Sequence, residues 1–315
     1  MSQSPSIPRP RIAQAFVLGA GLGTRLKGLT QARPKPLIPV AGRPLIAYAF
    51  DHLLGVGVER IVVNTHHCAE VYERFFPGTY RQATLTFRHE PVLLETGGGI
   101  KNVEDLLSGA PFLVYNGDIL ATLPLEPALQ HHFASGNEVT LVLRSHGGPL
   151  QVAFNPETRR VLDIGHRLGR ATGTHLFTGI YVVNPAFFQR LKLEKISVIP
   201  TILEMITQDA ALGAVVIDEG DWRDLGTREQ YLEVHRALRT ADPLACWIHP
   251  TAQVDPTARL TGATFVGAGA KIGPGAQLHD CILWEGTAIA EQSILTRCIV
   301  TENQTAYGCH TDVDF

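Results

Sequence analysis

A glycine-rich turn that carries one arginine is the part of this sequence best equipped for chemistry. The turn is Gly19-Ala20-Gly21-Leu22-Gly23-Thr24-Arg25, and ten residues later Lys35 stands between two prolines. Glycines let backbone N–H groups approach an anion closely, and an arginine fork adds donors for phosphate oxygens. The flanking prolines fix the backbone, so the ammonium of Lys35 is presented from a stiff segment. The pattern predicts a site that holds a nucleoside triphosphate by its phosphates.

The spacing of the glycines excludes two common phosphate-binding motifs. The pattern is Gly-x-Gly-x-Gly instead of Gly-x-Gly-x-x-Gly, and no Gly-Lys-Ser/Thr follows it. The turn is therefore neither a dinucleotide fingerprint nor a P-loop. The plain alternative is a tight strand-to-helix turn with incidental charges nearby.

Residues 17–45 closely resemble the opening of the sugar-phosphate nucleotidyltransferases, also called nucleotide-sugar pyrophosphorylases. The resemblance implies that the loop and Arg25 bind the triphosphate, and that Lys35 is a catalytic residue in contact with phosphate. The nucleotide-binding residues that it implies in the loop are Leu18, Gly19, Ala20, Gly21, Gly23 and Thr24.

Two aspartates stand where they could hold a divalent cation. Asp118 follows an apolar strand pattern, and Asp224 lies in the segment Trp-Arg-Asp-Leu-Gly-Thr. Mg²⁺ prefers one or two carboxylates together with phosphate oxygens and waters. Taken alone, Asp118 is as readily a turn residue, and Asp224 could simply lead into a helix over 228–238 with Thr227 as its N-cap. The resemblance implies that both aspartates hold Mg²⁺ and that Asp118 is catalytic.

A third segment, residues 90–101, has three successive glycines ahead of a predicted helix. Such glycines let a flat ligand lie against bare backbone, although they also suit a flexible helix lead-in. The resemblance implies a nucleobase loop that uses Glu90, Thr96, Gly97 and Gly98. The form Leu-Glu-Thr-Gly-Gly-Gly-Ile is most similar to N-acetylmuramate-1-phosphate uridylyltransferases and to mannose- and heptose-1-phosphate guanylyltransferases. Uracil and guanine therefore both stay open.

The sugar-phosphate contacts depart from the better-known family pattern. Thr178-Gly179 matches the segment that lies under the sugar ring, and Asn116 precedes Asp118 at the strand end. The usual Glu-Lys pair before this segment is missing, and Gly165–Arg170 stands in its place. Arg167 or Arg170 is then the candidate for the sugar phosphate.

The elements around these residues alternate between strand and helix patterns, which predicts an α/β fold with a Rossmann-like, mostly parallel sheet covered on both faces. Ligands of such sheets bind at the carboxyl ends of strands, where the glycine turn and Asp118 fall. The predicted nucleotidyltransferase domain spans 13–242 after a flexible tail over 1–12. The predicted strands are 13–18, 60–64, 85–88, 111–115 and 138–143. The predicted helices are 44–54, 69–75, 101–107, 126–135 and 228–238.

The last third of the chain has a six-residue repeat. An apolar residue recurs at Ile248, Val254, Leu260, Val266, Ile272, Leu278 and Trp284, and continues less regularly at Ile289, Ile294 and Ile299. This period resembles the hexapeptide-repeat, left-handed parallel β-helix and predicts such a domain over 245–315. With three hexads per coil, Ile248 stacks on Val266, and Val266 on Trp284. The strand edges of a last coil are compatible with a homo-oligomer.

Bulk properties narrow the class of protein. A length of 315 residues with 45% hydrophobic and 18% charged residues suits one or two folded domains. A net charge of −3 without a basic run argues against nucleic acid, and no apolar run is long enough for a membrane span. Five cysteines without a Cys-x-x-Cys pair suggest reduced thiols, mostly buried, in a cytoplasmic protein.

The reaction that the resemblance implies is Mg²⁺-dependent attack of a sugar 1-phosphate on the α-phosphorus of an NTP, which yields an NDP-sugar and pyrophosphate. The sugars considered are N-acetylmuramate, mannose, glucose and heptose 1-phosphates, and the triphosphates are UTP and GTP. Two alternatives remain. One is a catalytically silent sugar-nucleotide-binding regulatory subunit, and the other is a hexapeptide acyltransferase, which usually needs more coils than this chain supplies.

Overall fold

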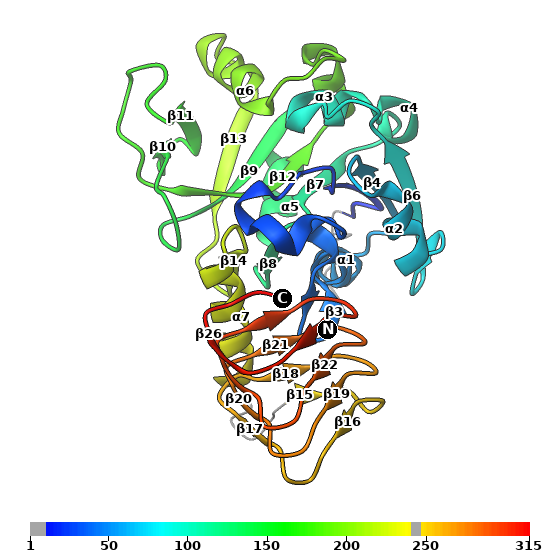
Figure 1. Ribbon diagram of the computed structural model, residues 1–315. Coiled ribbons are helices and arrows are strands. Elements are labelled where there is room, and N and C mark those ends of the chain that lie inside the picture. The colour runs from blue at the N-terminus through cyan, green and yellow to red at the C-terminus, as the bar shows by residue number, and fades with distance from the viewer. Residues whose placement is uncertain (1–10, 241–246) are drawn as a thin grey trace, which may run out of the picture. The chain divides into compact units, whose positions relative to one another are not determined.

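The computed structural model describes residues 11–240 and 247–315 (Figure 1). It divides into two compact units. The sheet unit comprises the chain up to Leu22 and Tyr48–Trp222, and the β-helix unit comprises Gly23–Ala47 and Arg223–Phe315. Residues 1–10 of the predicted tail, the predicted domain boundary at 242–245 and Cys246 lie outside the described residues.

A ten-stranded sheet forms the centre of the sheet unit, in the order β10-β11-β13-β9-β12-β7-β1-β4-β6-β5. In chain order, its strands are β1 Gln14–Leu18, β4 Arg60–Thr65, β5 Thr79–Tyr80, β6 Ala83–His89, β7 Phe112–Asn116, β9 Val139–Arg144, β10 Val152–Asn155, β11 Arg160–Ile164, β12 Leu176–Val183 and β13 Leu212–Val216. Strands β7, β1, β4 and β6 are parallel, as predicted, whereas β12 runs antiparallel between β7 and β9. A short strand, β8 (Ile119–Ala121), follows β7.

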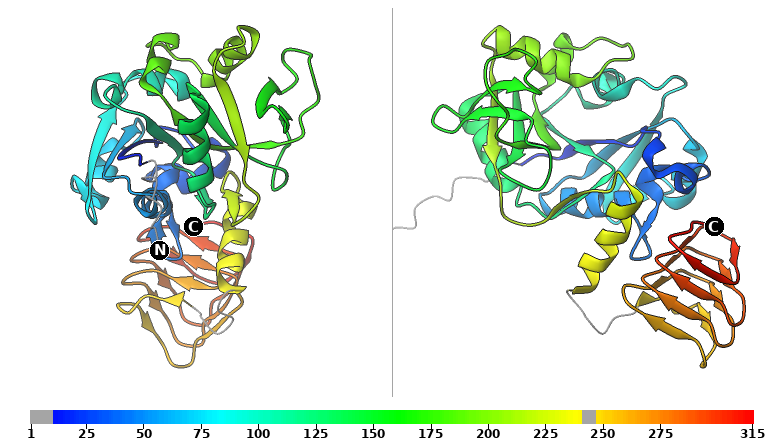
Figure 2. Two further views of the ribbon diagram at one scale, coloured as in Figure 1. Left: turned by 180° about the vertical axis from the view of Figure 1, so that it is seen from behind. Right: turned by 60° about the vertical axis from the view of Figure 1, so that its left-hand side comes forward.

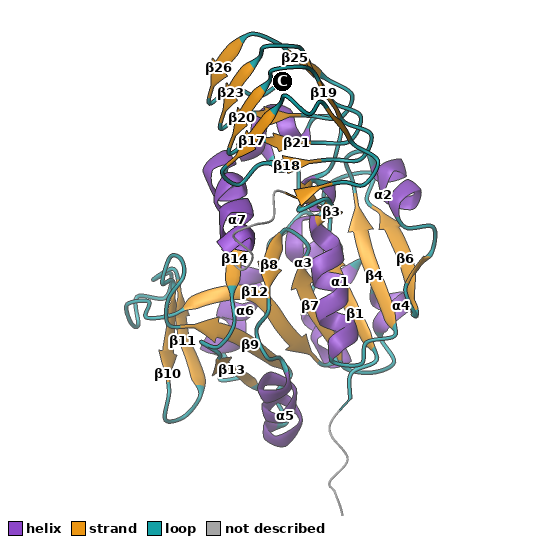
Figure 3. Ribbon diagram, turned by 90° about the horizontal axis from the view of Figure 1, so that it is seen from below, coloured by secondary structure: helices purple, strands orange, loops and turns teal. Residues whose placement is uncertain are grey.

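Both faces of the sheet are buried under helices, because alternate residues of each strand point to opposite sides. Phe16, Val62 and Val114 pack on one side against α3, α4 and α6, in a cluster that includes Ile202. On the other side, His52 of α1 meets the hydroxyl of Tyr115. Figure 3 shows α1 lying along the parallel strands. The helices of this unit are α1 Leu45–Gly55, which begins in the neighbouring unit, α2 Ala69–Phe75, α3 Glu95–Lys101, α4 Glu104–Leu107, α5 Glu126–Ser135, the 3₁₀ helix η3 Pro185–Arg190 and α6 Val198–Thr207.

The helix predicted over 101–107 is wrong in its bounds. The three glycines do not precede a helix; they lie inside α3, and α4 is a separate turn. The cause is tertiary, since the backbone of residues 194–197 packs directly onto Gly97 and Gly98, and the side chains of Asn64 and Glu90 pack onto Gly99. Local propensity, which disfavours glycine in helices, is overridden by that close packing.

Three parallel sheets form the C-terminal part of the β-helix unit, an arrangement consistent with the predicted left-handed β-helix (Figure 2). Its strands are β15 Trp247–Ile248, β16 Gln253–Val254, β17 Arg259–Thr261, β18 Phe265–Val266, β19 Lys271–Ile272, β20 Gln277–His279, β21 Ile282–Leu283, β22 Ala288–Ile289, β23 Ile294–Thr296, β24 Ile299–Val300, β25 Thr305–Ala306 and β26 Cys309–Thr311. The unit also holds η1 Thr24–Thr30, η2 Lys35–Leu37, β2 Pro39–Val40, β3 Arg43–Pro44 and α7 Arg228–Thr240. Strand β14 Trp222–Asp224 begins on the last residue of the sheet unit.

The predicted stacking holds for the first coil and then shifts. Ile248 pairs with Val266 as predicted, but Val266 pairs with Leu283, not with Trp284. The step from the inward-facing Leu278 to Leu283 takes five residues instead of six, because one corner of the coil is a residue shorter.

A second short corner follows later in the repeat. Leu278 pairs with Leu295, and Leu283 pairs with Val300, so the step from Leu295 to Val300 also takes five residues. The preceding step, from the inward-facing Ile289 to Leu295, takes six residues, so the predicted inward residue Ile294 is 43% exposed, while Leu295 is buried in the β-helix core.

Trp284, which falls just outside the inward register, is buried on another side. Its Nε1 donates to the hydroxyl of Tyr231 on α7 at 3.1 Å. Helix α7 thus packs against the outside of the sheet formed by β15, β18, β21 and β24, where His235 also contacts the ring of Phe265. Among the described residues, no helix is long and apolar enough to cross a membrane.

Candidate active site

The glycine turn starts at the carboxyl end of β1 and is held there by Asn64 from the end of β4. Asn64 is buried, and its Oδ1 accepts from the backbone N–H of Gly19 at 2.7 Å and of Ala20 at 3.4 Å. The hydroxyl of Tyr72 donates to the Gly19 carbonyl at 2.8 Å. A side chain at Gly19 would meet Asn64 and Val63 within 3 Å, so glycine is required there by packing.

Gly21 and Gly23 serve different purposes in the same turn. Gly21 is exposed, and a Cβ added to it would meet nothing within 4 Å. Gly23 has a left-handed backbone with φ of +62°, and its missing Cβ leaves room for the Cβ of Lys35 at 3.0 Å. The open side of the turn is therefore at Gly21, where a phosphate could approach bare backbone.

Glu90 is the second anchor of the turn and acts through Asn64. Its carboxylate has no exposed surface: Oε1 accepts from Nδ2 of Asn64 at 2.8 Å and Oε2 accepts from the N–H of Leu94 at 2.9 Å. Its carbonyl also bonds to Nδ1 of His66 at 2.7 Å. In this conformation the structure gives Glu90 a positioning contact, since both of its carboxylate oxygens are engaged within the protein.

The predicted nucleobase residues of α3 make close internal contacts. The N–H groups of Gly97 and Gly98 donate to the carbonyl of Ile196, and Oγ1 of Thr96 accepts from the N–H of Val198 at 2.8 Å. A Cβ on Gly98 would lie 2.0 Å from the carbonyl oxygen of Glu194. These glycines permit close packing of α3 on the segment that leads into α6.

Three of the predicted sugar-phosphate residues lie together. A Cβ on Gly179 would come within 2.3 Å of Nδ2 of Asn116, so the amide of Asn116 rests against bare backbone of β12. Gly179 has φ of +78° and lies where the register of β12 with β9 shifts. Thr178 is buried, and its hydroxyl donates to the Val142 carbonyl at 2.8 Å.

Arg167, the fourth predicted sugar-phosphate residue, lies in the exposed loop after β11 and not beside Asn116. The carboxylate of Asp163 shapes this loop by accepting the N–H groups of Leu168 and Arg170 at 3.1 Å. The guanidinium of Arg170 donates to the Ile206 carbonyl at 3.3 Å. Strands β13, β9 and β12 separate β11 from β7, a gap of roughly 19 Å at usual strand spacing.

Asp118 lies beside the start of the glycine turn within the sheet unit. The N–H of the preceding residue, Gly117, donates to the Leu18 carbonyl at 3.0 Å. Burial raises the pKa of Tyr72 well above its usual value, and the charge of Asp118 raises it further. The carboxylate of Asp118 is thus within electrostatic range of the Tyr72 hydroxyl, which bonds to the Gly19 carbonyl.

Lys35, Arg25 and Asp224 converge in the β-helix unit. The ammonium of Lys35, which is 4% exposed, lies 3.3 Å from Oδ1 of Asp224, and a guanidinium nitrogen of Arg25 lies 3.6 Å from Oδ2. Gly226 makes room for this arrangement, because a Cβ there would lie 2.5 Å from the Arg25 guanidinium. Two cations thus share one partly exposed carboxylate. Thr227 caps the N-terminus of α7 as predicted, with its Oγ1 accepting from the N–H of Gln230 at 3.2 Å.

Asp118 and Asp224 are suited to a divalent cation that is bound together with phosphate. In the described part of the chain, no three His, Cys, Asp or Glu side chains form a group that could hold a metal by themselves. Mg²⁺ bound together with phosphates needs only one or two carboxylates, so single aspartates such as Asp118 and Asp224 suit it.

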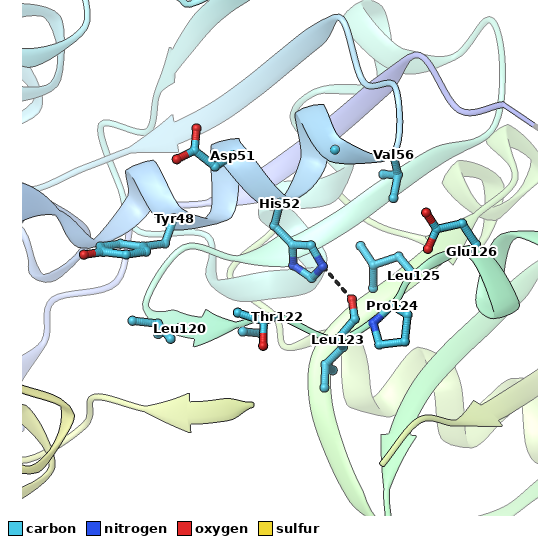
Figure 4. A pocket seen from close by; sticks show the side chains of 12 residues that line it. Tyr48, Asp51, His52, Val56, Leu120, Thr122, Leu123, Pro124, Leu125 and Glu126 are labelled. Atoms are coloured by element: carbon cyan, nitrogen blue, oxygen red, sulfur yellow. Dashed lines mark hydrogen bonds between the residues drawn. The ribbon is translucent and has the colours of Figure 1, made fainter. Parts of the chain in front are cut away.

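The sheet unit also has a groove that uses none of the predicted site residues. It encloses about 440 Å³ between α1 and the segment from Leu120 to Glu126 (Figure 4). His52 lies at its wall, with Nε2 2.6 Å from the Leu123 carbonyl. Burial lowers the pKa of His52 and so favours a neutral ring. The groove is lined mainly by apolar groups and offers no cationic cluster for phosphate.

Comparison with known proteins fits this geometry. The model of the nucleotidyl transferase family matches residues 14–241, which is more than half of the chain. This chain belongs to the nucleotidyl transferase family. A second model, the GMPPB C-terminal domain, matches residues 244–310.

Individual members of the nucleotidyl transferase family match over most of this chain. It is 29% identical over 297 residues to a mannose-1-phosphate guanylyltransferase of Mycobacterium tuberculosis, covering 90% of this chain and 83% of that one. Identity to mannose-1-phosphate guanylyltransferase 1 of Arabidopsis thaliana is 28% over 314 residues, covering 93% and 87%. A Bacillus anthracis structure assigned as a glucose-1-phosphate thymidylyltransferase superposes with a TM-score of 0.61 at 20% identity, covering 70% of this chain and 94% of that chain. That likeness shows the fold.

The sequence analysis does not single out Asn64, whose side chain holds the glycine turn. A polar residue inside an otherwise apolar strand is the signal that would have singled out Asn64, since buried polar groups need partners.

Proposed function

We propose that this chain transfers a nucleotidyl group from an NTP to a sugar 1-phosphate and releases pyrophosphate. The observation that carries the proposal is the convergence of Lys35 and Arg25 on Asp224, next to the glycine turn in the sequence. Family membership supports nucleotidyl transfer, and relatives named for mannose 1-phosphate support a sugar phosphate as acceptor.

In this proposal, the backbone around Gly21 receives the triphosphate, and Arg25 and Lys35 turn from Asp224 toward its phosphates. An oxygen of the sugar 1-phosphate attacks the α-phosphorus, the bond from that phosphorus to the bridging oxygen breaks, and pyrophosphate leaves with the bond electrons. The acceptor phosphate is already largely dianionic near pH 7, so no strong base is needed. Positioning and neutralisation of charge are then the main contributions of the protein.

We propose that Asp118 and Asp224 together hold Mg²⁺, with Asp118 also acting in catalysis. The ion would neutralise charge on the phosphates. Asp224 would exchange its present cationic partners for the metal as Lys35 and Arg25 engage phosphate. The chain's own residues therefore supply both the cation site and the phosphate donors.

For the acceptor, we propose that Asn116, Thr178 and Gly179 form the floor under the sugar. The contact between Asn116 and Gly179 supports this assignment. Arg167 remains a proposal that requires the loop after β11 to move toward the site. For the base, we propose guanine ahead of uracil, because the relatives are named guanylyltransferases. Mannose 1-phosphate is accordingly the first acceptor to test.

We also propose that residues 13–242 work as the catalytic domain and 245–315 as an appended β-helix in a cytoplasmic enzyme. The nucleotidyl transferase model ends at 241, and the second model begins at 244, which supports this division. Self-association through the edges of the last coil is a further proposal, and sedimentation of the full chain would test it.

The deciding experiment is a matrix of UTP and GTP against mannose, glucose, heptose and N-acetylmuramate 1-phosphates, read out as pyrophosphate release with and without Mg²⁺. We expect one pair to exceed the others clearly and to require the metal. Lys35→Ala should reduce turnover of that pair by about 10²–10³-fold, because a donor to developing charge is lost. Arg43→Ala, on β3 of the same unit, serves as the control. Near-normal turnover in Lys35→Ala would refute the proposed role.

A further inference from the structure

Arg33, two residues before Lys35, is bound to the β-helix. Its side chain is 3% exposed, and one guanidinium nitrogen lies 3.0 Å from Oε1 and 3.1 Å from Oε2 of Glu285. A second nitrogen pairs with Glu302, and the guanidinium lies 4.9 Å from the centre of the Trp284 ring. Glu285 and Glu302 follow β21 and β24, at the same corner of successive coils.

The segment that follows Asp224 is also bound to the last coils of the β-helix. Arg228 comes four residues after Asp224 and begins α7. Its Nε donates to Asp314 at 2.8 Å, and another nitrogen donates to Asp312 at 3.3 Å. A third contact goes to the carbonyl of Arg297. The last coils therefore hold the chain on both sides of the contact between Lys35 and Asp224.

Two buried contacts from α7 brace the segment that follows Lys35. The hydroxyl of Tyr231 donates to the Pro39 carbonyl and accepts from Trp284. Nε2 of His235 accepts from the N–H of Ala41 at 3.2 Å, while its Nδ1 donates to the Tyr231 carbonyl at 2.8 Å. Backbone groups of β2 and its turn are thus fixed by side chains from α7.

We propose that the last two coils of the β-helix are a positioning part of the active site, and that Arg33 and Arg228 are the positioning residues that set Lys35 against Asp224. The inference rests on the proposed function, since it assigns a role to the surroundings of the proposed phosphate and metal ligands. It gives the β-helix a part in turnover beyond assembly or packing.

The physical reason is geometric. Charge-assisted, forked contacts fix a guanidinium in both position and direction. Arg33 is two residues from Lys35, so a shift of Arg33 moves the base of that side chain with it. Displacement of a reacting or charge-bearing group by about 1 Å can cost about 100-fold in rate. The β-helix would therefore act on catalysis without touching substrate.

Arg228→Gln, with Arg236→Gln as its matched control, is the sharpest test. Both arginines lie on α7 and pair with β-helix aspartates, Arg236 with Asp280 at 2.9 Å. Arg236 is eight residues further along the helix, about 12 Å from the position of Arg228. We expect Arg228→Gln to lower kcat by about tenfold or more and to raise the NTP and Mg²⁺ concentrations at half-maximal rate. Arg236→Gln should stay within about twofold of the unchanged chain.

The Arg33 contact is tested by Glu302→Gln and by the double variant Glu285→Gln/Glu302→Gln, with the exposed Glu291→Gln as control. We expect a graded fall in kcat and faster hydrogen exchange of the backbone amides of residues 33–38, measured by mass spectrometry. Thermal unfolding of each variant shows whether it is folded at the assay temperature. The double variant leaves the buried charge of Arg33 without a carboxylate partner, which can prevent folding. If the double variant does not fold, Glu302→Gln and Arg228→Gln still test the proposal.

The readouts separate positioning from simple loss of folded protein. A smaller folded fraction lowers kcat alone, whereas a displaced Lys35 and Asp224 also change the NTP and Mg²⁺ dependence and the NTP affinity measured by calorimetry. Equal effects of Arg228→Gln and Arg236→Gln would overturn the proposal. So would unchanged kinetics in Arg228→Gln, in Glu302→Gln and in the double variant. If Lys35→Ala itself retains turnover, the proposed function fails. If Lys35→Ala is inactive while Arg228→Gln and the variants of Glu285 and Glu302 behave normally, only this inference fails.

Discussion

The ammonium of Lys35 lies 3.3 Å from Oδ1 of Asp224, although 189 residues separate the two along the chain. Both residues belong to the β-helix unit, together with Arg25 and the strands of the β-helix. The carboxylate that balances these cations in the free protein is also the one that we propose for the metal. Ligand binding would therefore rearrange charges that are already in place.

The metal dependence should respond to this carboxylate. Asp224→Asn keeps the shape of the side chain but removes its charge, so we expect the Mg²⁺ concentration at half-maximal rate to rise at least about tenfold. Titration of pyrophosphate release with Mg²⁺ measures it. The exposed Asp221→Asn, three residues earlier, is the control and should leave the curve in place. An unchanged curve for Asp224→Asn would remove this residue from the metal site.

Gly98 should be intolerant of alanine for a packing reason. Alanine inside a helix normally stabilises it by up to about 1 kcal/mol relative to glycine. Here the added Cβ would lie 2.0 Å from the Glu194 carbonyl oxygen, so we expect Gly98→Ala to lower the free energy of unfolding by about 1–3 kcal/mol. Denaturant titration gives the value, and a stabilised Gly98→Ala protein contradicts the close contact.

Gly21→Ala is the control for Gly98→Ala, because the added methyl group points into open space. A Cβ there meets nothing within 4 Å, so stability should change by less than about 0.5 kcal/mol. If phosphate lies against this backbone, as we propose, the methyl group should still weaken NTP binding, which calorimetry measures. A variant that binds NTP normally would place the phosphates elsewhere on the turn.

Asn64→Asp should be destabilising in a pH-dependent way. The new carboxylate could still accept from Gly19, but it would face the buried Glu90 where Asn64 now donates a hydrogen bond. We expect a loss of about 2 kcal/mol or more at pH 8 and less at pH 5, where the pair can share a proton. Asn155→Asp, whose Oδ1 only accepts from turn N–H groups, should change little at either pH. Equal stability of both variants at pH 8 is the contrary outcome.

Acid should weaken the β-helix unit through His235. Burial lowers the pKa of this ring from 6.5 to about 4. Since the folded pKa lies below the unfolded one, the contribution to stability is complete above pH 6.5 and is lost as the pH falls from 6.5 toward 4. His235 accounts for roughly 3 kcal/mol over that range.

Unfolding titrations between pH 7 and 4.5 measure this effect. His235→Gln should show a shallower decline than the unchanged chain. The decline that remains includes His132, whose pKa burial also lowers to about 4. Identical slopes for the two proteins would show that folding does not lower the pKa of His235.

Local sequence was enough to predict much of this fold. Alternating strand and helix patterns gave the parallel core from β1 to β7, and the helices over 69–75 and 126–135 match their predicted bounds. The six-residue period predicted the β-helix, because each inward residue must meet a neighbour from the next coil. Such signals are local or strictly periodic, so they survive without knowledge of distant contacts.

The tertiary structure alone decided the contacts that join segments distant in the sequence. Residues 194–197 pack closely on Gly97 and Gly98 inside α3, and one five-residue corner moved Trp284 out of the β-helix core. The pairing of Lys35 with Asp224, and of Arg33 with Glu285, joins residues about 190 and 250 positions apart. No local pattern encodes such a pairing, because its energy arises only when burial removes the charges from water and leaves each the other as partner.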